Sequence, residues 1–148
     1  MRAHVTLAAF LAVAGLAPAV AQSDSPQVER HELMEDIGDA AKVMGDMAKG
    51  TVPFDSVEVQ EALTIVIDNA KVFPTLFPEG SETGNDTRAL PAIWENKADF
   101  EEKANDLVVA AEAARGAADN GLDSFRAAFG KIGETCRACH TDYRAEKE

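Results

Sequence analysis

Apolar residues recur every three or four positions along four stretches of the chain, the spacing that places side chains on one face of a helix. The first stretch follows Ser25-Pro26, a capping residue and a proline at the first helical position, and it ends near Lys49 because Gly50 follows. Its apolar or small residues are Met34, Ile37, Ala41, Met44 and Ala48. These signals predict a first helix over about residues 26–49.

A second helix is predicted from Asp55, where "DSVE" places an acidic cap three residues before a glutamate, to Pro74. Within it, "LTIVID" is β-branched enough for a strand, but the helical signals around it favour a helix. A connection rich in proline, glycine and polar residues follows, between Phe73 and Leu90. Its length would let it cross between the helices of a bundle.

Two further helices complete the pattern. One opens at Pro91 and continues to Asn120-Gly121, a plausible C-cap. The last begins near Asp123 and holds the only two cysteines of the chain. Without repeats or a sign of a second domain, these stretches predict an all-α fold, an antiparallel four-helix bundle.

The first 21 residues have the pattern of a cleavable signal peptide rather than of the bundle. Arg2 supplies a positive start, residues 5–16 an apolar core, and Ala19-Val20-Ala21 a small-x-small cleavage site. The apolar run is short for a bilayer span and is broken by Pro18. We therefore expect cleavage after Ala21, export to the periplasm, no membrane span afterwards, and a mature domain of residues 22–148.

The chain is strongly acidic. Its formal charge is −12, and removing residues 1–21, which hold Arg2 and no acid, makes it −13. This balance excludes nucleic acid and anionic membranes as expected partners, because both need basic patches. It is compatible with a basic protein partner steered by long-range attraction, and also with solubility alone.

The most informative motif is "CRACH", in which Cys136, Cys139 and His140 follow one another at helical spacing. Positions related by three and four residues emerge on one face of a helix. Two thiols so placed can form thioethers with one haem while the histidine binds its iron, and the pattern C-x-x-C-H is typical of c-type haem attachment. The motif predicts one haem c per chain, with His140 as the proximal iron ligand.

Three other chemistries compete for these residues. A zinc site needs four ligands, and the chain offers only two cysteines and two further histidines, one of them in the leader. A haem-free disulfide oxidoreductase is expected beside a βαβ pattern, which the sequence lacks. A structural disulfide between residues three apart would close too small a loop to constrain the unfolded chain much. All three are weaker explanations than haem.

A four-helix chain with C-x-x-C-H near its C-terminus resembles the class II cytochromes c, the cytochrome c-prime family. The resemblance covers the mature chain through "RHELM", "LFPEGS", "PAIWENKADF" and "CRACHTDYR". The last is the most specific, since the family commonly follows the haem motif with an aromatic and a basic residue, here Tyr143 and Arg144.

The resemblance implies that the first helix covers the distal haem face and that the residue four after its arginine points at the iron. Here the pair is Arg30 and Met34. Members with a methionine there resemble a low-spin branch with a closed site, whereas members with a non-ligand leave the iron open to nitric oxide or carbon monoxide. Met44 and Met47 are expected in the core, and His31 on the surface rather than at the iron.

Four residues are expected around the haem. Arg30 is interpreted either as the partner of a haem propionate or as a solvated surface residue. Arg144 lies four residues after His140, over the proximal face or its edge. Trp94 and Tyr143, each the only residue of its kind, pack either against the porphyrin or in the plain core. Arg137 is expected to face away from the cysteines.

We therefore expect an exported electron carrier, not an enzyme, that moves single electrons through a haem ligated by His140 and Met34. Its partners are expected to be redox proteins, with a basic docking surface. The alternative is a five-coordinate gas-binding cytochrome c-prime. Family members often dimerise through their first two helices, so both a monomer and a homodimer stay open.

Overall fold

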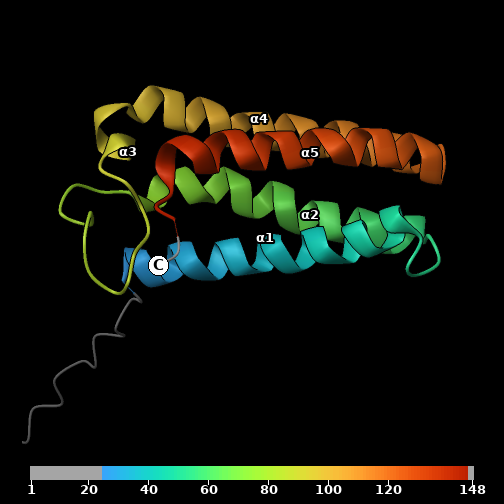
Figure 1. Cartoon of the computed structure of the whole chain (residues 1–148), viewed down its shortest axis with the longest axis horizontal. Helices are drawn as coiled ribbons and strands as arrows, with labels where there is room; N and C mark the ends of the chain where they lie inside the picture. The colour runs from blue at the N-terminus through green and yellow to red at the C-terminus, as the bar shows by residue number, and fades with distance from the viewer. Residues whose placement is uncertain (1–24, 147–148) are drawn as a thin grey trace, which may run out of the picture.

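The computed structural model describes residues 25–146 as a bundle of long helices (Figure 1). Its elements are α1 (Pro26–Lys49), α2 (Ser56–Val72), the 3₁₀ turn η1 (Phe73–Leu76), α3 (Ala92–Glu95), α4 (Lys97–Ala118) and α5 (Leu122–Tyr143). The only β-pairing among these residues is one antiparallel bridge between Ala89 and Arg144. The predicted all-α bundle is confirmed, whereas the signal peptide predicted for residues 1–21 lies outside the described residues.

The predicted start and end of the first helix and the predicted start of the second are confirmed, whereas α2 ends at Val72, two residues before the predicted Pro74. Ser25 caps α1 by accepting a hydrogen bond from the Val28 N–H, and Gly50 ends it with a φ of 77°, a left-handed conformation that glycine adopts without strain. Asp55 caps α2 by accepting from the Val57 N–H at 2.8 Å. The segment "LTIVID" lies inside α2, so the strand interpretation was wrong.

The third predicted helix is not continuous, which corrects its expected course from Pro91. Asn96 has φ −126° and ψ 47°, outside the helical region, and separates α3 from α4. The break allows Ile93 and Phe100, from the two helices, to be buried in one aromatic cluster. The sequence carries no proline or glycine at this point that would have signalled it.

The core has two parts. The main cluster runs through α1, α2, α4 and α5 and includes the fully buried Met44, Leu63 and Phe125. The second cluster, at the end of the bundle beside α3, is formed by Phe77, Ile93, Phe100 and Tyr143, with Trp94 and Cys139 packed against it. The two cysteines of the motif therefore contact different clusters: Cys136 packs against the main one and Cys139 against the second.

The long connection between η1 and α3 is hydrogen-bonded to the start of α1 and to the end of α5. Asn85 donates to the Ser25 hydroxyl, and Gln27 of α1 donates to the Thr83 carbonyl at 2.8 Å. At the other end, the Leu90 N–H donates to the Tyr143 carbonyl at 3.0 Å. Across the part of the chain described here, no helix combines the length and apolarity that a bilayer crossing requires.

Candidate functional site

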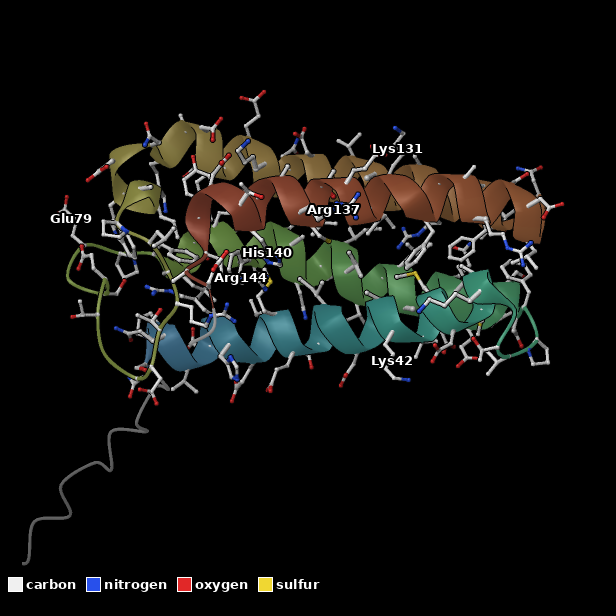
Figure 2. The ribbon with its side chains drawn as sticks, viewed as in Figure 1. Lys42, Glu79, Lys131, Arg137, His140 and Arg144 are labelled. Atoms are coloured by element: carbon white, nitrogen blue, oxygen red, sulfur yellow. The ribbon has the colours of Figure 1, made fainter. Side chains whose placement is uncertain are left out.

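The haem motif lies near the end of α5, and Figure 2 shows His140 and Arg144 on the side of that helix that faces α1. Cys136, Cys139 and His140 are each partly buried. In contrast, Ile132 before them and Tyr143 after them are almost fully buried, 2% and 5% exposed. The core packing of α5 is therefore interrupted at the motif.

The core packing of α1 is interrupted in the same way. Arg30 and Ile37 are 5% and 6% exposed, yet Met34, which lies between them on the same side of the helix, is only partly buried. The start of α1 and the end of α5 lie at the same end of the bundle (Figure 1). The two interruptions therefore lie at the same level of the structure.

The contact between α1 and α5, here called the seam, is the loosely packed side of both helices. Each of these helices packs closely along another neighbour, α2 and α4 respectively, but they touch each other sparsely. Gly38, four residues after Met34, has no atom within 4 Å of where a Cβ would stand. At Gly133, three residues before Cys136, a Cβ would meet only the tip of Arg137, at 3.8 Å.

A glycine inside a helix costs about 1 kcal/mol relative to alanine. Packing within the described chain does not require either of these two. Small residues on both sides of a loosely packed seam, together with two thiols and an imidazole on α5, fit a covalently attached haem.

The electrostatics of the motif also suit iron binding. Burial lowers the pKa of His140, and the nearby Arg144 and Arg88 lower this pKa further. The imidazole is therefore neutral at neutral pH, which is the form that binds metals. Arg88 was not singled out from the sequence; it reaches this place because its guanidinium donates to the Ala145 carbonyl, at 3.0 Å from Nε.

The two thiols do not have the character of a redox pair. Burial raises the pKa of Cys139 to about 11, and burial also raises the pKa of Cys136. Catalytic dithiols depend on a lowered thiol pKa, because the thiolate is the nucleophile. The structure thus gives no support to the disulfide oxidoreductase.

The zinc interpretation gains no support either. Nowhere in residues 25–146 do three or more His, Cys, Asp or Glu side chains gather as metal ligands would. His31, the other histidine outside the leader, is exposed on α1 and lies 3.3 Å from Glu35. Its predicted surface position is confirmed.

The three methionines of α1 occupy two kinds of environment. Met44 and Met47 are buried in the core, 0% and 2% exposed, as predicted. Met34 instead lies at the edge of the main cluster, where the seam begins. Its role as the distal ligand stays a prediction.

Arg30 is not a surface residue, so that interpretation was wrong. It is 5% exposed, and its guanidinium donates from Nε to the Leu76 carbonyl at 2.7 Å and from Nη1 to the Ser81 carbonyl at 2.9 Å. Its remaining nitrogen donates to the Ser81 hydroxyl. The guanidinium carbon also lies 4.1 Å from the centre of the Phe77 ring and 5.5 Å from that of Trp94.

Arg30 therefore fastens the long connection to α1 one turn before Met34. Sequence reasoning missed Ser81, 4% exposed, as its main partner, although the residue lies inside "LFPEGS". Pairing of Arg30 with a haem propionate stays a prediction.

Tyr143 and Trp94 belong to the aromatic cluster beside Cys139. The rings of Tyr143 and Phe100 meet edge to face with centroids 5.3 Å apart. The Tyr143 hydroxyl donates to Asp99 Oδ2 at 2.5 Å, and burial together with Asp99 raises the pKa of this phenol to about 12. Asp99 was not foreseen, because only the fold brings α4 beside the end of α5.

Arg144 follows α5 in extended conformation and pairs with Ala89 in the single β-bridge. Its side chain is exposed and close enough to His140 to lower the pKa of that imidazole. The predicted place of Arg144 over the proximal haem face stays a prediction. Arg137 is exposed, as expected.

Comparison with known proteins agrees with this site. A family model described as Cytochrome C' matches residues 25–144. The cytochrome c' of Rhodopseudomonas palustris is 40% identical over 147 residues, 99% of each chain. Cytochrome c-556 of Agrobacterium tumefaciens is 39% identical over 122 residues, 82% of this chain and 98% of that protein.

The fold agrees as well. A solved structure of cytochrome c' from Rhodopseudomonas palustris has a TM-score of 0.81 and 38% identity, covering 85% of this chain and 100% of that one. Proteins of this family bind haem c covalently, which confirms the predicted cofactor. The chain belongs to the cytochrome c' family, the class II cytochromes c.

Proposed function

We propose that this protein is a periplasmic one-electron carrier whose haem iron is held by His140 and Met34. The observation that carries the proposal is the position of Met34, the one methionine of α1 that the core leaves partly exposed, level with the half-buried motif on α5. When bound, haem c supplies an iron that cycles between ferrous and ferric states. His/Met ligation raises the reduction potential of this iron relative to more basic ligands.

The residues of the motif have separate tasks in this proposal. Cys136 and Cys139 hold the cofactor by thioether bonds, so it cannot diffuse away from an exported protein. His140 offers a neutral nitrogen, kept so by burial and by two neighbouring arginines. None of these residues needs to move a proton during electron transfer.

The distal side is held by Arg30. Its bonds to Leu76 and Ser81 fix the first turns of α1 against the long connection, and Met34 is one turn further along. A ligand on a fixed helix keeps the same place in both oxidation states. Little rearrangement then accompanies electron transfer, and no vacant position is left for a substrate.

A five-coordinate, gas-binding protein is the second candidate. A neighbour supports it: a variant of cytochrome c prime from Alcaligenes xylosoxidans, 28% identical with a TM-score of 0.74, has been solved as a nitric oxide complex. In that case Met34 would only pack between α1 and α5 without binding the iron, and the iron would bind carbon monoxide or nitric oxide directly.

Replacement of methionines separates the two candidates. In haem-loaded protein, Met34→Leu should convert a low-spin spectrum into a high-spin one while the haem stays attached. Met44→Leu, on the same helix but fully buried in the core, is the matched control and should leave the ligand field unchanged. A Met34→Leu spectrum identical to that of the wild type would mean that Met34 is not the ligand.

A further inference from the structure

The outer faces of α1 and α2 carry a second set of residues at helical spacing, apart from the residues that form the core. On α2 they follow at intervals of three and four, which is the pattern of a helix that packs against a partner. This set comprises Glu58, Glu61, Ile65, Asp68 and Val72 on α2, with Glu32, Asp36, Asp39 and Val43 on α1.

A surface hollow, here called the α1–α2 groove, lies between these two rows. Its apolar floor includes Val43 and Ile65. Its rim has four carboxylates, two from each helix: Asp36, Asp39, Glu58 and Glu61. The groove therefore combines a small apolar surface with a dense negative edge.

The exposed aliphatic side chains of the molecule gather on the same helix. Of the five large apolar residues that are strongly exposed in residues 25–146, three lie on α2: Val57, Ile65 and Val72. A fourth, Val52, precedes α2, and only Val109 lies elsewhere. Single exposed aliphatics are ordinary, but several along one helix indicate a contact surface.

None of the rim carboxylates forms an ion pair within the described residues, although Lys42, whose pKa is raised mainly by Asp46, also feels the charge of Asp39. The ion pairs of the molecule involve other acids, such as Asp46 with Lys42 on α1 and Glu112 with Arg115 on α4. Asp36 accepts only a neutral hydrogen bond, from the Asn69 amide at 3.3 Å. Like charges held side by side repel one another, and a cationic surface would relieve this repulsion.

We propose that the α1–α2 groove is the docking site of a basic protein partner, which presents lysine or arginine side chains around an apolar residue that enters the groove. The chemistry of the surface stands alone, whereas the identification of the partner as a redox protein rests on the proposed function. Met34 is on α1 too, so a partner docked here lies about one helix diameter, roughly 10–12 Å, from the seam.

A second copy of this chain is a poorer occupant. A two-fold symmetric contact places the same patch on both sides. The four carboxylates of one rim would then face the four of the other, and such like-charge contacts are costly at an interface. Complementary charge favours a different, basic protein.

Binding of a defined probe tests the proposal. The probe is a synthetic peptide of lysine and leucine with the leucines on one helical face, and calorimetry measures its dissociation constant for the haem-loaded protein. Glu58→Gln with Glu61→Gln should weaken binding about fivefold, as expected for two exposed ion pairs. Glu101→Gln with Glu102→Gln, an equal charge change on exposed residues of α4, should weaken it by less than about twofold because salt screens distant charges.

The floor of the groove is tested separately. Ile65→Ser should weaken the binding, whereas Val109→Ser, at a more exposed aliphatic residue on α4, should not. Equal effects of the groove and control changes, or no binding by the wild type, would overturn the proposal. So would sedimentation that shows a wild-type dimer turned into a monomer by the groove changes, because a second copy would then cover the groove.

The absorption spectrum of each sample keeps this test apart from the proposed function. A high-spin wild type that still binds the peptide through the groove would leave the docking site standing and remove the His/Met electron carrier. A low-spin wild type that does not bind the peptide through the groove would leave the His/Met electron carrier standing and remove the docking site.

Discussion

Replacement of the buried Arg30 by alanine should destabilise the protein by about 3 kcal/mol. The side chain makes three hydrogen bonds, to the Leu76 carbonyl at 2.7 Å, the Ser81 carbonyl at 2.9 Å and the Ser81 hydroxyl. Bonds to a charged donor are each worth about 1.5–3 kcal/mol, but the buried guanidinium also loses its hydration. After the lost hydration is subtracted, each of the three bonds contributes about 1 kcal/mol, which gives the total of about 3 kcal/mol.

The loss includes the acceptors that the change leaves behind. The Ser81 carbonyl keeps a weaker donor, the amide of Gln27 at 3.3 Å, whereas no other donor reaches the Leu76 carbonyl within the described chain. Arg30→Lys should recover only part of the stability, because one ammonium group cannot span both partners as the planar guanidinium does.

Urea unfolding of the haem-loaded protein measures this loss. Lys42→Ala is the matched control, since Lys42 is a cation of the same helix that points away from the bundle (Figure 2). Its ammonium group pairs with Asp46 at 2.9 Å. An exposed pair of this kind contributes little to stability, because solvent and salt screen it. If Arg30→Ala cost no more than Lys42→Ala, the contacts of Arg30 would not hold the long connection, and the reasoning would be refuted.

Tyr143, the only tyrosine, should ionise near pH 12 in an absorbance titration. Asp99→Asn should lower the midpoint of this titration. An unchanged midpoint would show that Asp99 does not raise the pKa of Tyr143. Because the folded pKa lies above the unfolded value, the stability that this phenol contributes should be complete below about pH 10 and lost as the pH rises towards 12. Asp55→Ala should cost about 1 kcal/mol in urea unfolding by removing the cap of α2, and a loss near zero would contradict the cap. Met44→Ala, at a side chain with 0% exposure, should cost about 2–5 kcal/mol by leaving a cavity, unlike an exposed substitution.

The helix ends were predictable from the sequence because their signals are local. Ser25, Gly50 and Asp55 each act on a backbone group within a few residues, and all three have the predicted roles. The break at Asn96 was not predictable, since it depends on how Ile93 and Phe100 pack in the tertiary structure.

The candidate site divides in the same way. The motif residues Cys136, Cys139 and His140 were recognisable because their spacing on one helix defines their chemistry. The burial of Arg30 was missed, because its acceptors belong to a connection about fifty residues away in sequence and lie within reach only after folding.

The most direct test of the central claim is the absorption spectrum of the reduced, haem-loaded protein before and after addition of carbon monoxide. We expect sharp low-spin bands that carbon monoxide barely changes, because Met34 and His140 would both hold the iron. A broad high-spin spectrum that carbon monoxide shifts at once would show an open iron, and the gas-binding function would replace the electron carrier.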